Sequence, residues 1–304
     1  METILISLPV FLIIFFGWFC HKIKIVDKNW VHTLNGFAYY VALPALIISS
    51  FWKVDFASSG TWFLIFESVA IIILFSALVF GILSLFKIDK KIKTTILLGS
   101  IVGNTVFIGF PLVDMNFGKE YLNQSALIGS FFLIIPIIFV ILFIQYQHKS
   151  QETSIKKELL GLLKNPLVIS IVLGIILSFF ELEYTIFESI EKTIAMLGAT
   201  ASPVALFALG AFLHGQSKKN LKFSLVISFL KMIVLPVLAV LISFFVFKNN
   251  DIKVITLLSS MPVAVTTFVI AEKFGLNKDL IGDSILISTI FSFIIAPIVI
   301  SLFL

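Results

Sequence analysis

A group of helix-weakening residues in an apolar setting decides the fold. Residues 97–111 read LLGSIVGNTVFIGFP, in which Gly103, Asn104, Gly109 and Pro111 interrupt an otherwise apolar run. Such residues favour a break in a helix, and inside a lipid bilayer each backbone group that a break frees must find another partner. The stretch therefore predicts an interrupted membrane helix.

The composition places the rest of the chain in the membrane as well. Of the 304 residues, 59% are hydrophobic and 13% are charged, and the mean hydropathy is +1.12. A membrane span needs roughly 20 apolar residues, so about nine or ten spans are possible and no sizeable water-soluble domain fits. The lysines lie in short loops and form no basic face, which excludes nucleic-acid binding.

The distribution of lysines predicts the orientation of the spans. Sixteen of the 22 lysines lie in the odd-numbered loops and five in the even-numbered loops. Lysine is enriched in cytoplasmic loops, so we expect a multi-pass protein of the cell inner or plasma membrane with both termini outside. The ten predicted spans cover about residues 3–20, 31–52, 61–86, 95–117, 124–144, 165–180, 193–213, 221–247, 254–271 and 284–303.

The second half of the chain resembles the first at an offset of about 160 residues. Residues 95–100 resemble residues 254–260, and residues 125–132 resemble residues 284–291. Five spans per repeat is an odd number, so the second copy enters the membrane in the opposite sense, as in many secondary transporters. The predicted organisation is a first five-helix repeat at 1–147, a cytoplasmic linker at 148–164 and a second, inverted five-helix repeat at 165–304.

A second break is expected at the equivalent place in the second repeat. Residues 259–268 read SSMPVAVTTF and contain Pro262 followed by two threonines. Two interrupted helices that cross near the middle of the membrane offer free N–H groups and positive helix ends to an anion. The alternative is that these residues only kink or pack ordinary membrane helices. Pro44 and Pro203, in the second span of each half, are expected to break their helices and to shape the opposite wall.

Two charged residues lie well inside predicted spans, more than a turn from the span ends, where charge is costly and marks a functional pathway by default. Glu67 lies in the third span and Lys231 near the middle of the eighth. Glu67 is either a rim residue near the outer water or a carrier of a proton or cation. Lys231 is either a structural tether to backbone carbonyls or a charge that offsets the substrate.

The residues do not support an enzyme. The chain has no metal-binding histidine motif, no catalytic dyad within a span and no phosphate-binding glycine pattern. We therefore expect no catalytic residue, metal or cofactor, and we expect energy to come from a gradient or from a partner. The chain also lacks arginine, so helix ends, an amide and hydroxyls would have to hold a carboxylate.

Four motifs resemble the auxin efflux carrier family, which includes plant auxin exporters and bacterial permeases for malate and malonate. They are NGFAYYVALPAL at 35–46, GNTVFIGFPL at 103–112, SPVALFALGAFL at 202–213, and MPVAV with FVIAEK within 261–273. The resemblance implies ten helices in two inverted five-helix repeats, similar to the bile acid sodium symporter fold. Helices 1, 2, 6 and 7 would form a scaffold that often dimerises, and helices 3 to 5 and 8 to 10 a mobile transport domain with broken crossover helices 4 and 9.

The resemblance also carries over to single residues. Asn104 matches the crossover asparagine, Pro262 the ninth-helix proline and Glu67 an acidic residue of the third helix in plant members. Gly103 stands where plant exporters have proline. The linker is short, without the long regulatory loop of many plant proteins.

We expect a secondary carrier of small organic anions, either malate-like dicarboxylates or auxin-like monocarboxylates, that works by an elevator movement in the lipid bilayer as a homodimer. The alternative is a ligand-binding membrane sensor or accessory subunit with the same fold; paired broken helices disfavour a passive channel. The predicted substrate-binding residues are Ser49, Ser50, Asn104, Thr105, Pro262, Thr266 and Thr267.

Overall fold

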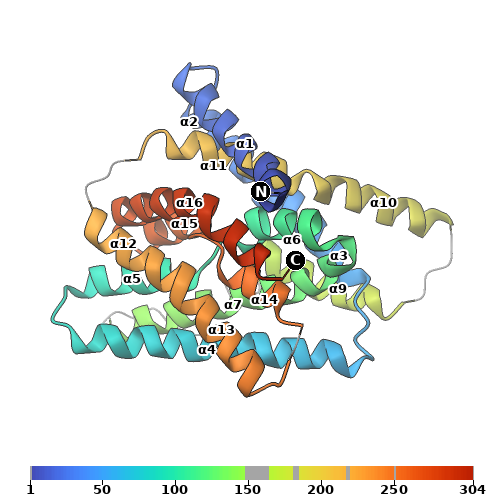
Figure 1. The fold of residues 1–304 in the computed structure, drawn as a ribbon. Helices are drawn as coiled ribbons and strands as arrows, with labels where there is room; N and C mark the ends of the chain where they lie inside the picture. Colours follow the sequence, from blue (N-terminus) through green and yellow to red (C-terminus); the bar gives the residue numbers. More distant parts are fainter. Residues whose placement is uncertain (1, 148–163, 181–184, 217–219, 250, 304) are drawn as a thin grey trace.

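The computed structural model is helical throughout the residues that it describes, which are 2–147, 164–180, 185–216, 220–249 and 251–303 (Figure 1). The predicted linker therefore lies outside the described residues, except for Lys164. In the first half the helices are α1 (Glu2–Lys22), α2 (Lys28–Phe37), η1 (Ala38–Ala42), α3 (Leu43–Trp52), α4 (Ser59–Leu85), α5 (Lys90–Ile101), η2 (Thr105–Gly109), α6 (Phe110–Phe117), η3 (Lys119–Tyr121) and α7 (Leu122–Gln147).

The second half contains a comparable series. Its helices are α9 (Pro166–Ser178), α10 (Thr185–Ala199), α11 (Ala201–Leu213), α12 (Leu221–Phe229), η4 (Leu230–Val234), α13 (Leu235–Phe245), α14 (Lys253–Ser259), α15 (Thr266–Lys273) and α16 (Lys278–Ser301). Within the described residues, seven helical stretches are long and apolar enough to cross a membrane. The other predicted spans consist of shorter pieces, so the arrangement of ten spans in two inverted repeats stays a prediction.

Polar residues set where several helices begin. The side chains of Asp27, Ser58, Asp89, Asn165 and Asn277 each accept a hydrogen bond from a backbone N–H in the first turn of the following helix. These bonds satisfy donors that have no partner within the helix. The apolar runs therefore begin their helices at points that the sequence marks.

Prolines inside the helices are accommodated differently from our expectation. Pro44, Pro111 and Pro236 each follow a five-residue π-helical segment, η1, η2 and η4 respectively, and the helix continues through all three. A proline ring clashes with the carbonyl four residues before it, and each of those carbonyls lies in the middle of a π segment, where the wider turn relieves the clash. The predicted breaks at Pro44, Gly109 and Pro111 are thus π segments, not interruptions.

Pro203 lies in the first turn of α11, where a proline needs no hydrogen-bond partner for its nitrogen. The interruption of this span is limited to Thr200, the one residue between α10 and α11. The true breaks among the predicted positions lie at Gly103 and around Pro262, where the chain leaves the helical conformation.

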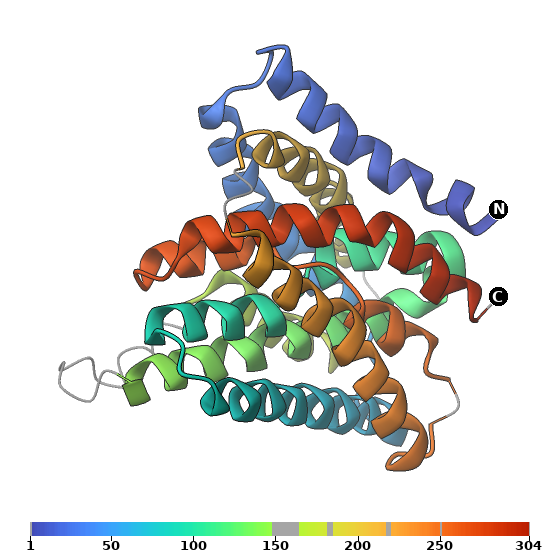
Figure 2. The same cartoon turned by 60° about the vertical axis from the view of Figure 1, so that its left-hand side comes forward.

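The two interrupted helices α5 and α14 lie in the interior of the molecule. Every residue from Thr94 to Ile101 in α5, and from Val254 to Ser259 in α14, is buried. Helices α1 and α4 lie at opposite faces, with α16 between them, and both chain ends lie at one edge (Figure 2). Broken helices are tolerated because protein, not lipid, surrounds the freed backbone.

Close packing of α1 on α11 depends on two glycines. A Cβ atom at Gly17 would collide with the backbone of Phe207, and a Cβ atom at Gly210 would collide with the backbone of Ile14. Small residues allow such close approach of helices in membranes, where lipid removes the usual hydrophobic driving force. Helix α1 also reaches α16 through the stacked rings of Phe11 and Phe293, whose centroids lie 4.0 Å apart.

We predict that Gly210→Val separates α1 from α11 and lowers the free energy of unfolding by about 1–3 kcal/mol, the usual cost of overpacking. Thermal unfolding of the detergent-purified protein would measure the effect. Gly81→Val is the matched control, because no atom lies within 4 Å of the Cβ position of Gly81 on α4. Equal melting temperatures for the two variants would contradict the packing role of Gly210.

Candidate functional site

The two broken helices meet through a short antiparallel pairing of their backbones. Helix α5 ends at Ile101, helix α14 ends at Ser259, and Gly103 forms a β-bridge with Val263. Asn104 N donates to the Pro262 carbonyl at 2.7 Å, and Ala264 N donates to the Val102 carbonyl at 3.2 Å. Each break therefore supplies partners for the backbone groups that the other break frees.

Side chains from two further helices complete this crossing. On α16 the Ser288 hydroxyl accepts a hydrogen bond from Val263 N at 3.0 Å. On η4 the Lys231 ammonium donates to the Ser259 carbonyl at 2.7 Å, with the side chain only 1% exposed. The contact agrees with the tether interpretation of Lys231. Its predicted role in offsetting substrate charge stays a prediction.

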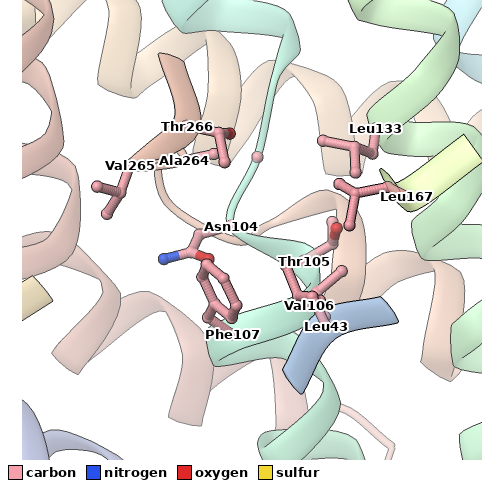
Figure 3. A pocket seen from close by; sticks show the side chains of 11 residues that line it. Leu43, Asn104, Thr105, Val106, Phe107, Leu133, Leu167, Ala264, Val265 and Thr266 are labelled. Carbon is pink, nitrogen blue, oxygen red and sulfur yellow. The ribbon is translucent and has the colours of Figure 1, made fainter. Parts of the chain in front are cut away.

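A small cavity lies beside the crossing (Figure 3). Its open space is about 20 Å³ for the centres of water-sized molecules, which is enough for a water molecule but not for an organic acid. The cavity must therefore widen before a substrate can bind. It is lined by Leu43, Gly103, Asn104, Thr105, Val106, Phe107, Leu133, Leu167, Ala264, Val265 and Thr266.

Three of the predicted binding residues line this cavity with unpaired polar atoms. Asn104 Nδ2, Thr105 Oγ1 and Thr266 Oγ1 are buried and have no hydrogen-bond partner. Buried polar atoms are nearly always paired in proteins, and leaving one unpaired costs free energy. The Asn104 amide and the Thr105 hydroxyl from the first break, and the Thr266 hydroxyl from the second, are thus available to a ligand.

Helix ends add positive potential to the same place. The helical stretch of η2 and α6 begins at Thr105, α15 begins at Thr266, and neither start has a side-chain cap. The first N–H groups of a helix have no partner within that helix, and its N-terminal end carries a partial positive charge. At α15 the N–H groups of Thr267 and Phe268 already donate to the carbonyls of Ala264 and Val265, so this end contributes its dipole more than free donors. Both features favour a negatively charged group at the cavity.

Four other predicted residues do not line the cavity. Ser49 and Ser50 donate to the Leu46 carbonyl of their own helix, at 3.0 and 2.8 Å. Thr267 Oγ1 donates to the Ala264 carbonyl at 2.6 Å, and Pro262 contributes its backbone carbonyl to Asn104. Thr267 and Pro262 thus belong to the crossing, whereas Ser49 and Ser50 bond within α3, and all three hydroxyls already donate a hydrogen bond.

Sequence reasoning missed the apolar wall of the cavity. Leu43 of α3, Leu133 of α7 and Leu167 of α9 come from three helices that are distant in sequence. Unlike a polar or helix-breaking residue, one leucine among many in a membrane helix carries no distinguishing signal. Only the position of Leu43 directly before Pro44 could have drawn attention to it.

Glu67 lies away from the cavity, between α4 and the end of α13. Its carboxyl is fully buried, and its Oε2 accepts a hydrogen bond from Asn249 Nδ2 at 3.0 Å. Ser243 of α13 lies beside the carboxyl, whose Oε1 has no hydrogen-bond partner. The side chain is closed off from water, and both interpretations of Glu67, a rim residue and a carrier of a proton or cation, stay predictions.

A second buried carboxyl escaped the sequence analysis. Asp283 on α16 is 1% exposed, and its Oδ2 accepts hydrogen bonds from the backbone N and the side-chain Nδ2 of Asn220, at 3.0 and 3.1 Å. Asn220 directly precedes α12, so this carboxyl stabilises the start of that helix. Asp283 was missed because it precedes the predicted tenth span by one residue.

Comparison with known proteins groups the chain with membrane transporters. A family described as membrane transport protein matches residues 4–300. An uncharacterised transporter of Methanocaldococcus jannaschii is 29% identical over 97% of this chain and 96% of its own length. A "putative malonate transporter" of Rhizobium meliloti is 26% identical over 94% of this chain and 91% of its own length.

A plant relative matches over a shorter region. Auxin efflux carrier component 8 of Arabidopsis thaliana is 28% identical over 41% of this chain and 36% of its own length. The match to the family covers the spans, both breaks and every residue of the cavity wall. The chain therefore belongs to the membrane transport protein family, as its resemblance to the auxin efflux carriers predicted.

Proposed function

We propose that this protein is a secondary carrier of small organic anions, with malate-like or malonate-like dicarboxylates as the first candidates. The observation that carries the proposal is the cavity at the crossing, where three unpaired polar atoms lie beside two uncapped helix starts. The name of the Rhizobium meliloti relative supports a dicarboxylate. No arginine is present, so the carboxylate is held by N–H groups, the Asn104 amide and the hydroxyls of Thr105 and Thr266.

The proposed movement is of the elevator type. Helices α4, α5, α7 and α12 to α16 pack mainly on one another, whereas α1, α2, α3, α9, α10 and α11 form a second set of contacts. We assign the first set to a mobile transport domain and the second to a scaffold that dimerises. In the proposed topology the chain has ten spans in two inverted repeats and both termini outside. The inverted repeats allow the crossing to open toward either side of the membrane in turn.

The first test removes the amide at the cavity. Asn104→Ala should lower uptake of labelled malate or malonate into proteoliposomes by about tenfold, the usual effect of losing a hydrogen bond to a charged group. Asn116→Ala is the control, because the Asn116 amide donates to the Leu112 carbonyl and to Ser7 and does not line the cavity. Undiminished uptake by a folded Asn104→Ala protein would remove this residue from the site.

The same assay separates a carrier from a sensor. A carrier delivers several anions per protein molecule into the vesicles, whereas a sensor or accessory subunit gives saturable binding without flux. Mono- and dicarboxylates should be compared in one panel, since the cavity residues favour negative charge and do not select chain length.

The second test concerns proton coupling at Glu67. We propose that this carboxyl carries a proton, because it is buried and no lysine pairs with it among the ion pairs of the described residues. Glu67→Gln keeps the shape and an oxygen for Asn249 but cannot ionise, so the dependence of uptake on an imposed pH gradient should disappear. Asp283→Asn, which changes the other buried carboxyl, should keep that dependence. A pH profile unchanged by Glu67→Gln argues against the proton role.

A further inference from the structure

The crossing contains a cation that belongs to the protein itself. Lys231 on η4 is among the largest side chains that are fully buried. Its ammonium donates one hydrogen bond, to the Ser259 carbonyl at 2.7 Å. An ammonium has three N–H donors, so a protonated Lys231 has unused donor capacity in the middle of the protein.

The surroundings of this ammonium are the C-terminal ends of the two broken helices. Ser259 is the last residue of α14, and Gly103 follows the end of α5 by two residues. A Cβ atom at Gly103 would lie 2.6 Å from Lys231 Nζ, so the ammonium packs directly on this glycine. Helix C-terminal ends carry a partial negative charge and free carbonyls, which favour a cation.

No carboxylate balances this charge within the described part of the chain. The ion pairs there involve other lysines, and the buried carboxyls Glu67 and Asp283 are bonded to Asn249 and Asn220. Burying an unpaired ammonium costs several kcal/mol, whereas an apolar side chain of similar volume would fill the same space without that cost. A lysine at this position therefore points to a use for the charge.

We propose that Lys231 is a tethered cation, which occupies the position where a crossover carrier would otherwise bind a free inorganic cation such as Na⁺. Broken helices in secondary transporters hold coupling cations with unwound carbonyls and half-helix C-terminal ends. Here Lys231 Nζ bonds to the last carbonyl of α14 and packs on Gly103, a residue of the unwound segment. The anion transport proposed above would then need no Na⁺. This inference rests on that proposed function for its consequence, but not for its binding test.

Lys231 also lies close enough to the cavity to attract an anion bound there. Gly103 contacts the ammonium and lines the cavity, so one backbone residue separates the fixed positive charge from the anion. Electrostatic attraction at this short range in a protein interior is poorly screened. The tethered cation therefore contributes to anion binding without a direct hydrogen bond.

The test uses Lys231→Ala, which vacates the position, and Lys231→Met, which fills it without charge. Wild-type uptake should be equal in sodium and choline media. Lys231→Ala should fall to about a tenth or less of wild type in choline, the effect of losing a charged hydrogen bond, and should recover in part with Na⁺ or methylammonium. Lys231→Met should fall similarly and should not recover. Lys222→Ala, at an exposed lysine of α12, is the control and should behave as wild type.

Thermal unfolding of the purified proteins provides a readout that needs no transport. The wild-type Tm should be the same in sodium and choline chloride. The lower Tm of Lys231→Ala should rise with Na⁺ or methylammonium, because a ligand that binds only the folded state stabilises it. If no anion is transported by the wild type, the proposed function fails, and this measurement still decides whether Lys231 fills a cation position.

Several results would overturn the inference. These are sodium-dependent uptake or a sodium-dependent Tm in the wild type, and a folded Lys231→Ala protein whose Tm responds to none of the cations. If Lys231→Ala does not fold, the wild-type sodium measurements and Lys231→Met decide the matter. Full wild-type uptake by Lys231→Met would show that the charge is dispensable.

Discussion

The pairing of two broken helices is the constraint on which the rest of the structure depends. A membrane protein cannot leave backbone donors and acceptors exposed to lipid, and here the Gly103–Val263 bridge and its flanking hydrogen bonds pair the two breaks with each other. The surrounding helices exclude lipid from the crossing, which is why α5 and α14 can be short, interrupted and almost completely buried. Ser288 then bonds to the Val263 N–H, and Lys231 bonds to the Ser259 carbonyl, two groups that the bridge does not pair.

The crossing separates charge as well as satisfying hydrogen bonds. Helices that start at Thr105 and Thr266 turn positive ends toward the cavity, whereas helices that end at Ile101 and Ser259 turn negative ends toward Lys231. Surroundings that favour negative charge and surroundings that favour positive charge thus lie on two sides of Gly103. The absence of arginine is consistent with this arrangement, since the backbone supplies the potential that a guanidinium would otherwise provide.

The structure also explains why the bundle tolerates so many prolines. Within the described residues, three of them follow π-helical segments, in which the wider turn makes room for the ring and keeps the span continuous. Gly17 and Gly210 have the opposite role, because they bring two helix backbones into contact and hold α1 on α11. The π segments therefore keep the spans continuous, and the two glycines allow close packing of helices. Only the breaks at Gly103 and Pro262 lie beside the cavity.

The sequence by itself determined that the chain is a helical membrane protein, where its helices lie and where two of them are interrupted. Apolar length and helix-breaking residues carry that information locally, and four motifs, one of them around Asn104, led to the correct family. Only the tertiary structure decided which hydroxyls remain free, since Ser49, Ser50 and Thr267 bond to nearby carbonyls whereas Thr105 and Thr266 do not. The partners of Glu67 and Lys231 and the apolar cavity wall depend on contacts between distant helices, which no local pattern specifies.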